Sequence, residues 1–257
     1  MPTLQTVLSG ASFAAGNIQI PALPSFAQPL IWTYFGGSLA NCGNGGNGGA
    51  WSNVNAGPNY PAGQNPNYGA GYITCTVSST AGAQLSLISA ALDTAAIANL
   101  TMLSVFRTTN LSGAVVPLIA ARGSDGKGVG LQLVPNTKSF SGTTSGSASF
   151  PSVTVTQGFT SFMMGAVTHT DGTANADLAY DLTHGVTGAA TGTATVRTYS
   201  ATNNWTAGNP GAGTPGTWGG PVDLAFAAVI PGVLNPTTLQ GIYAHVKAVL
   251  GFRGIII

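Results

Sequence analysis

The chain has 257 residues, of which 5% are charged, and its formal net charge is +1. Ordinary soluble domains have about 25% charged residues, so catalytic carboxylates are scarce here. The sequence contains no glutamate, and its seven Lys and Arg residues are scattered, which excludes a basic surface for nucleic-acid phosphates. With 44% hydrophobic residues the chain can bury a sizeable core, so we do not expect a disordered protein.

Residues 1–25 are predicted to form an N-terminal arm or lead-in strand, and residues 26–257 a single domain. Pro21, Pro24 and Pro29 favour extended backbone after a short apolar stretch at 18–20. Two interpretations are open: a first edge strand with its lead-in, or an arm that ties this subunit to a neighbour. No basic residue precedes the first apolar patch, and no uninterrupted apolar stretch reaches membrane-spanning length, so we expect neither a secretory signal nor a transmembrane helix.

A buried strand at 30–35 is followed by a long loop at 41–71 that is rich in Gly, Asn and Pro. This loop carries Trp51, Tyr60 and Tyr68, and a second Gly- and Pro-rich loop carries Trp205 and Trp218. Aromatic rings on such loops either stack on sugar rings or pin the loop onto its own domain. The five aromatic residues are therefore the candidate glycan-binding residues.

Cys42 and Cys75 bracket the first loop. A disulfide between them would close a loop of roughly 30 residues and contribute about 3–4 kcal/mol in the chain-entropy model. Two cysteines alone do not establish a disulfide, and synthesis in the cytosol favours free thiols. Zinc is not expected, because neither cysteine has a CxxC or nearby His partner.

Apolar and β-branched runs separated by turn residues predict further strands at 72–77, 100–107, 115–121, 128–134, 159–169, 177–182, 193–199 and 224–230. One helix is predicted near the C-terminus, capped by Asn235, started by Pro236 and ended by Gly251. The final residues, 252–257, are predicted to form a short apolar strand that completes a sheet or enters a partner. The pattern indicates an all-β, two-sheet antiparallel β-sandwich (jelly roll) with one C-terminal helix.

Three stretches carry a family resemblance: LTMLSVFR at 100–107, FMMGAVTHTDG at 162–172, and VDLAF at 222–226 followed by GVLNPTTLQGIY at 232–243. Their order and spacing resemble the concanavalin A-like, laminin-G-like jelly-roll superfamily over residues 26–250. The resemblance implies two curved antiparallel sheets packed face to face. Members include lectins, glucanases, and modules of bacteriophage tail and capsid-surface proteins, so it implies architecture more than activity.

The chain departs from this family in its missing glutamates and its long Gly- and Asn-rich loop. Glucanases of the fold use paired glutamates about 5 Å apart, so that mechanism is absent. Asp177 and Asp181 are four residues apart, which places them about 13 Å apart on one strand, too far for either glycosidase geometry. No nucleophile elbow accompanies His169, His184 or His245, and we interpret all three as structural, with His245 exposed. We therefore predict that the chain is not an enzyme.

Calcium is the one cofactor that the resemblance suggests, because lectins of this fold often bind it. Asp171, Asn175 and Asp177 are close in sequence, and Asp125 lies in a predicted hairpin turn. Asp-Gly is also a common hairpin dipeptide, and we favour that interpretation. Asp223 matches the aspartate of the family's closing strand, where it braces nearby backbone.

Two functions from different classes fit these features. The first is a non-enzymatic structural protein of a bacteriophage virion, a capsid-surface decoration or fibre subunit that is made in the host cytoplasm and forms a homo-oligomer, with a trimer as our expectation. The second is a carbohydrate-binding, lectin-like adhesin of a tail or cell surface. The near-neutral charge and apolar tail favour the first, and the aromatic loops favour the second. The expected partners are other copies, other virion proteins and host glycans.

Overall fold

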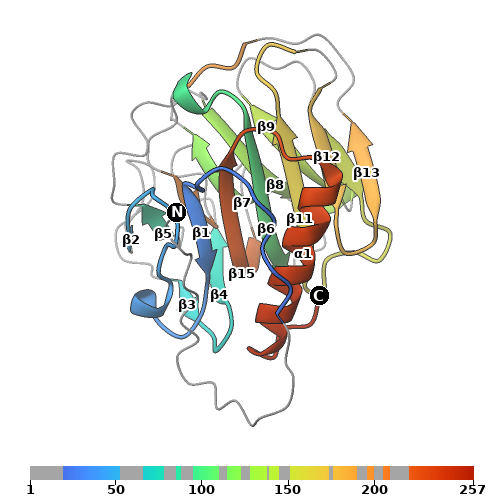
Figure 1. Ribbon diagram of the computed structural model, residues 1–257. Coiled ribbons are helices and arrows are strands. Elements are labelled where there is room, and N and C mark those ends of the chain that lie inside the picture. Colours follow the sequence, from blue (N-terminus) through green and yellow to red (C-terminus); the bar gives the residue numbers. More distant parts are fainter. Residues whose placement is uncertain are drawn as a thin grey trace.

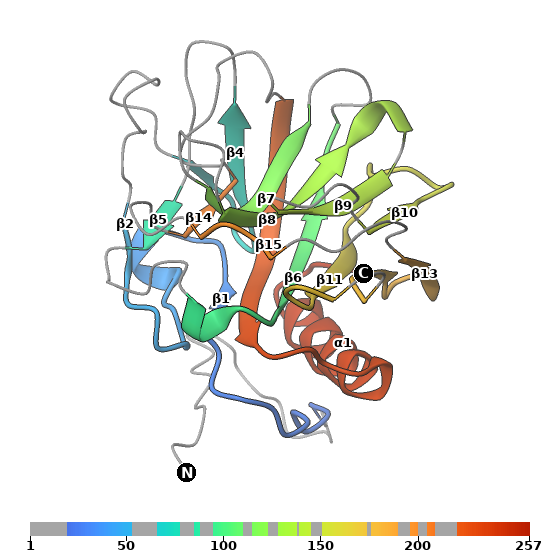
Figure 2. The same ribbon diagram turned by 90° about the horizontal axis from the view of Figure 1, so that it is seen from above.

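The computed structural model describes residues 20–52, 66–77, 85–87, 95–109, 115–122, 128–137, 139–144, 151–173, 176–189, 196–199, 205–208 and 220–257. These residues form two antiparallel sheets that lie face to face, with one α-helix packed on the outside of the larger sheet (Figures 1 and 2). The predicted two-sheet β-sandwich with a C-terminal helix is confirmed. No helix in the described part of the chain is long and apolar enough to cross a membrane.

The larger sheet has eight strands in the order β13-β12-β11-β6-β15-β4-β3, and β1 pairs with β15. Its strands are β1 (Ile31–Tyr34), β3 (Asn67–Tyr68), β4 (Ile73–Val77), β6 (Leu100–Arg107), β11 (Met163–His169), β12 (Leu178–Asp181), β13 (Val186–Ala189) and β15 (Gly220–Pro231). All of its pairings are antiparallel.

The smaller sheet has seven strands in the order β10-β9-β8-β7-β14-β5-β2. Its strands are β2 (Trp51–Ser52), β5 (Leu85–Leu87), β7 (Val116–Arg122), β8 (Gly128–Val134), β9 (Ser139–Thr144), β10 (Ser152–Thr154) and β14 (Thr206–Ala207). Three short 3₁₀ helices, η1 (Leu39–Asn41), η2 (Ala95–Ile97) and η3 (Pro135–Thr137), lie in the connections.

Strand β6 shows why this sequence makes a sandwich covered on both faces. Its side chains alternate, so that Met102 and Phe106 enter the core between the sheets while Leu103 and Val105 enter the core beneath the helix. All four are fully buried. Each such side chain contributes about 1.5–3 kcal/mol relative to leaving it in water. A near-continuous apolar strand is therefore what a sheet between two cores requires.

The helix α1 (Pro236–Gly251) begins as predicted, because the side-chain oxygen of Asn235 accepts a hydrogen bond from the Thr238 N–H at 2.9 Å. Its buried face packs on the larger sheet and comprises Leu239, Ile242, His245, Val246, Val249 and Leu250. The helix ends at Gly251, but Gly251 does not adopt a left-handed conformation. That conformation belongs to Gly254, at φ +74°, and Ile255 N–H then bonds back to the Leu250 carbonyl at 3.0 Å.

Most predicted strands are present, and two are not. Strands β6 and β8 have the predicted bounds, whereas β15 is longer than predicted and β11 begins only at Met163. Of the predicted strand 193–199 the structure describes residues 196–199, which belong to no strand and bond to the turn after β11 and to Gly128. Residues 252–257 form no strand either. The turn at Gly254 returns the chain to the helix, and Ile255 and Ile257 pack into the core beneath it.

Residues 20–29, which we call the N-terminal strap, lie against α1 and the larger sheet. Phe26 stacks on Trp32 with ring centroids 5.5 Å apart, and Pro24 lies close to Gly241 of the helix. His245 Nδ1 donates to the Pro21 carbonyl at 2.6 Å. The prediction that His245 is exposed is wrong, since the strap covers it and leaves it 8% exposed. The proposed boundary at residue 25 stays a prediction.

One side chain, Asn44, makes four hydrogen bonds that hold the loop after β1. Its Oδ1 accepts N–H bonds from Trp32 at 2.9 Å and Gly46 at 3.0 Å. Its Nδ2 donates to the carbonyls of Leu30 and Gly49, both at 3.0 Å. Backbone N–H groups of Gly45, Asn47 and Gly48 add three bonds, each at 2.9 Å, to the carbonyls of Trp32, Pro29 and Leu30. Together with the amide they take the place of the ladder that a further strand would have supplied at this edge. The described part of the Gly- and Asn-rich loop is pinned onto its own domain.

Candidate functional site

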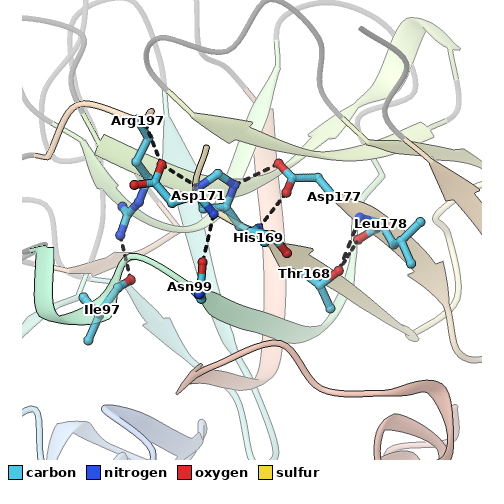
Figure 3. A network of polar contacts seen from close by, with 9 residues as sticks. Ile97, Asn99, Thr168, His169, Asp171, Asp177, Leu178 and Arg197 are labelled. Atoms are coloured by element: carbon cyan, nitrogen blue, oxygen red, sulfur yellow. Dashed lines mark hydrogen bonds and ion pairs between the residues drawn. The ribbon is translucent and has the colours of Figure 1, made fainter. Parts of the chain in front are cut away.

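Polar side chains gather at the end of β11, where the segments 95–99 and 196–199 also meet (Figure 3). His169 is the last residue of β11, Asp171 lies in the turn that follows, and Asp177 precedes β12. The close-up shows these side chains pointing toward one another, together with Asn99 and Arg197. We call this set the His169 cluster.

The imidazole of His169 lies between two carboxylates. Its Nδ1 is 2.8 Å from Oδ2 of Asp177, whose Oδ1 accepts the Thr170 N–H at 2.7 Å. Its Nε2 is 3.8 Å from Oδ1 of Asp171, which is beyond hydrogen-bond distance. Asp177 therefore fixes the ring orientation and closes the turn between β11 and β12.

Asp171 joins this turn to two distant segments. Its carboxylate accepts the Arg197 N–H at 2.7 Å and the Tyr199 hydroxyl at 2.8 Å, and its own N–H donates to Asn99 Oδ1 at 2.9 Å. The Arg197 guanidinium donates from Nη2 to the Ile97 carbonyl at 2.8 Å and lies 4.6 Å from the Tyr199 ring centroid. The cluster thus fastens three parts of the chain at one end of the sandwich.

The chemistry open to the His169 cluster is limited by burial. An aspartate that orients an imidazole is also found in acid–base catalysis. Here His169 is 3% exposed, Asp177 8% and Arg197 2%, so a substrate has no surface to approach. Nε2 faces a carboxylate rather than a serine or cysteine nucleophile. The geometry serves to hold the fold together.

The same aspartates were candidates for calcium. Asp171 and Asp177 both use their carboxylate oxygens for the internal bonds given above, while Asn175 and Asp125 lie outside the described residues. Among the residues that the structure describes, no group of three or more His, Cys, Asp or Glu side chains is arranged to hold a metal ion. The hairpin-turn interpretation of Asp125 and of the aspartates after β11, favoured over calcium binding, stays a prediction.

A second Asp–His pair closes the hairpin between β12 and β13. Asp181 Oδ1 accepts the N–H groups of Thr183 at 3.1 Å and His184 at 3.0 Å, and its Oδ2 lies 2.7 Å from His184 Nδ1. The pattern is a side-chain-capped turn that directs the chain back into β13. Asp177 and Asp181 therefore sit at opposite ends of β12, each with its own histidine.

A partly exposed ion pair lies on the helix side of the larger sheet. Arg107 Nε is 2.7 Å from Asp223 Oδ2, and Asp223 Oδ1 accepts the Thr74 hydroxyl at 2.6 Å. The guanidinium lies 5.0 Å from the ring centroid of Tyr72 and 4.4 Å from that of Phe162. Asp223 was predicted to brace backbone and instead pairs with two side chains from neighbouring strands.

The predicted glycan platforms are not surface rings where the structure describes them. Trp51 is 5% exposed, donates from Nε1 to the Thr33 hydroxyl at 2.8 Å and packs on Phe35. Trp205 is fully buried. Neither ring offers a free face, because each supplies apolar area to the core, which corrects this part of the prediction. Tyr68 is half-buried against the same core.

Tyr60 and Trp218, the other two predicted glycan-binding residues, lie outside the described residues.

Both cysteines are buried free thiols, so the disulfide predicted as one alternative is not formed. Cys42 Sγ accepts the Gly36 N–H at 3.4 Å and lies 3.8 Å from the same residue's carbonyl, whereas Cys75 Sγ lies 3.8 Å from the Ala207 carbonyl. Each thiol therefore has its own backbone partner on a different segment. Burial raises the pKa of both thiols, most strongly that of Cys75.

Comparison with known proteins supports the fold and goes no further. No protein-family model and no curated protein matches the sequence. Among solved structures, the binding domain of botulinum neurotoxin serotype G matches with a TM-score of 0.57 and 12% identity, over 84% of this chain and 50% of that one. The chain folds as a jelly-roll-type β-sandwich.

Two structures of the Trypanosoma rangeli sialidase also match, at TM-scores of 0.48 and 0.46 and identities of 15% and 14%. Each match covers 70% of this chain but only 29% and 28% of the sialidase. The chain thus spans half or less of the proteins that it matches. At these identities the likeness describes architecture, and the two sialidase matches carry no argument about activity.

Sequence reasoning found part of the His169 cluster and missed the rest. His169, Asp171 and Asp177 stand within nine residues and were singled out, whereas Asn99 and Arg197 gave no local signal. Asn44 was one of several asparagines in a Gly-rich loop. Its position two residues after Cys42 does not distinguish it from its neighbours.

Proposed function

We propose that the chain is a non-enzymatic structural protein of a bacteriophage virion, a capsid-surface decoration or fibre subunit that works by packing against other protein. The proposal rests on how the few ionisable side chains are used. Each described aspartate, at 171, 177, 181 and 223, accepts hydrogen bonds from within the fold. None is left over as an acid or base in an open cleft.

The histidines support the same conclusion. His169 and His184 each direct Nδ1 to an aspartate, and His245 directs Nδ1 to the Pro21 carbonyl. A catalytic histidine needs a ring nitrogen within reach of a bound substrate. Nε2 of His169 and of His245 makes no hydrogen bond, but both nitrogens are buried. His169 and His245 are buried, and His184 closes a hairpin.

The surface has the character of a subunit rather than of a freely diffusing enzyme. Because the net charge is +1 and the described aspartates are bonded within the fold, little charge remains to keep copies apart. Several apolar side chains are exposed, among them Ile256 at 86% and Val196 at 68%. Neutral polar surface with exposed apolar residues favours extended contacts with other protein.

The experiment is immunogold electron microscopy of phage particles purified from the source culture, with an antibody against this chain, beside light-scattering mass measurement of the purified chain. Label distributed over capsids or fibres, with an oligomer in solution, is the expected result. A chain absent from purified particles and strictly monomeric would overturn the proposal.

Glycan binding is the second candidate function. The match to a domain named for binding supports it, and so does Tyr68, a partly buried residue on the edge strand β3. Trp51 and Trp205 do not contribute, so the test is a glycan array probed with the native chain and with Tyr68→Ala and Trp218→Ala. Loss of a specific glycan signal in either variant, with unchanged folding, is the expected outcome. Uniformly absent binding by the native chain would overturn it.

A further inference from the structure

Two strand edges lie together on one flank of the sandwich. β13 ends the order of the larger sheet and β10 ends that of the smaller one. The backbone of Gly188 in β13 touches Ser152 in β10 so closely that a Cβ at position 188 would overlap the Ser152 carbonyl oxygen. Figure 2 shows both strands at the same side of the molecule. Glycine at 188 thus brings the two sheets into contact at this flank.

The outward edge of β13 has no pairing partner among the described residues. On its other side β13 pairs antiparallel with β12, from Val186 opposite Asp181 to Ala189 opposite Leu178. In an antiparallel strand, alternate residues direct N–H and C=O groups away from that partner. Val186, Thr187 and Ala189 are exposed residues.

This edge carries no residue that prevents strand pairing between molecules, although its four-residue length limits the pairing. Exposed edges are commonly protected by a short strand, a lysine, a proline or a bulge. β13 reads Val-Thr-Gly-Ala and contains none of these residues, and its register with β12 is unbroken. Strand β10, Ser-Val-Thr, is equally uncharged. A continuous neutral edge of this kind is suited to adding a strand.

We propose that β13 pairs antiparallel with β13 of a second copy, joining the two larger sheets into one continuous sheet. The inference rests on the proposed function, for which it supplies the contact between subunits. A twofold axis perpendicular to the sheet places Thr187 opposite Thr187, or Gly188 opposite Gly188. Charged residues in such a pairing would face like charges, and the strand has none.

The second copy is the occupant favoured by this self-complementarity. A four-residue strand alone buries less than the roughly 1,200–2,000 Å² of a stable interface, so the adjacent β10 edge contributes to the contact. Ser152 and Thr154 of β10 are exposed on the same flank and can enlarge the contact area. A twofold contact produces dimers or larger even assemblies, in contrast to the trimer expected from the sequence.

The test replaces Thr187 by lysine and measures mass by light scattering over a concentration series. The matched control is Thr76→Lys, an exposed threonine of strand β4 in the same sheet but not at this flank. We expect the native chain and Thr76→Lys to dimerise with the same Kd. Thr187→Lys should weaken association about tenfold or more, because two like charges then meet across the axis. Circular dichroism and the thermal midpoint verify that both variants fold.

A second variant shows whether the contact is direct. Thr187→Asp alone should weaken association by a similar factor, while an equimolar mixture of Thr187→Asp and Thr187→Lys should restore the dimer. With Thr187 opposite Thr187, the introduced Lys and Asp face each other directly. With Gly188 opposite Gly188, they are diagonal neighbours on the same face of the sheet. The β13 pairing would be overturned if Thr187→Lys and the native chain dimerise with the same Kd. It would also be overturned if the mixture of the Lys and Asp variants does not restore the dimer.

The outcomes separate this inference from the proposed function. A chain found on particles that does not dimerise through β13, or that uses β13 to bind a different protein, retains the structural role and refutes the second copy as occupant. A chain that dimerises through β13 but is absent from particles retains the inference about the contact and refutes the virion role.

Discussion

Removal of the Asn44 side chain tests whether one amide holds the first long loop. Asn44→Ala deletes two bonds received from backbone N–H groups and two donated to carbonyls, all between 2.9 and 3.0 Å. The contact with the Thr33 hydroxyl, at 3.4 Å, is long and adds little. The N–H groups of Trp32 and Gly46 and the Gly49 carbonyl would lose this partner, whereas the Leu30 carbonyl keeps the Gly48 N–H at 2.9 Å.

The expected effect follows from these contacts. A hydrogen bond contributes about 0.5–1.5 kcal/mol net, so four bonds give about 2–6 kcal/mol. Asn44 is half-buried, and water that enters can replace some of the lost partners, which leaves about 2–4 kcal/mol of destabilisation. For a chain of this length that corresponds to a fall in Tm of about 4–16 °C.

The assay is urea unfolding followed by the fluorescence of buried tryptophans such as Trp32 and Trp51. Asn47→Ala is the control in the same loop, because Asn47 is exposed, and it should change the free energy of unfolding by about 0.5 kcal/mol or less. Asn44→Asp keeps the acceptor and removes the two donors, so its free energy of unfolding should be lower than that of the native chain. If Asn44→Ala and Asn47→Ala unfold at the same urea concentration, the amide does not hold the loop and the reasoning fails.

Three further predictions concern the thiols, a glycine and the strap. Burial raises the pKa of Cys42 and Cys75, so only the unfolded chain loses thiol protons above about pH 8.5. The free energy of unfolding should therefore fall by up to about 1.4 kcal/mol per thiol per pH unit above that value, and urea titrations of the double alanine variant should show a flatter profile. Gly36→Ala combines φ of +124° with a Cβ only 2.7 Å from backbone and should cost about 2–4 kcal/mol, whereas Gly158→Ala, with φ of +76° and nothing within 4 Å, should cost about 1 kcal/mol in the same assay. His245→Leu should speed hydrogen exchange in residues 20–29, and unchanged exchange there would show that this hydrogen bond does not hold the strap.

The strands that the sequence predicts best are the ones buried on both faces. β6 and β8 have the expected bounds because their apolar side chains leave no ambiguity about where burial begins. The strands near the sheet margins were not predicted, among them β9, β10 and β13. They consist mainly of Ser, Thr, Gly and Ala, and their place in a sheet is decided by backbone pairing that composition does not reveal.

The candidate sites show a similar limit. Aromatic residues in Gly-rich loops predict either a sugar platform or an anchor, and the sequence alone does not decide between them. Trp51 is an anchor because Thr33 satisfies its indole N–H inside the core. Trp205 is also buried but has no such partner among the described residues. Its position shows that apolar area outweighs the loss of one hydrogen bond.

The low charge of the chain has a direct consequence for its edges. The described aspartates each brace a turn or a neighbouring strand, so the sandwich uses its scarce charges where they fix the fold. Few charges then remain to protect exposed strands, and β13 and β10 have none. A protein under selection to remain monomeric would be expected to place a lysine there at little cost in stability. The neutral flank is therefore better explained as a contact surface than as an unprotected edge, and Thr187→Lys is the change that separates the two explanations.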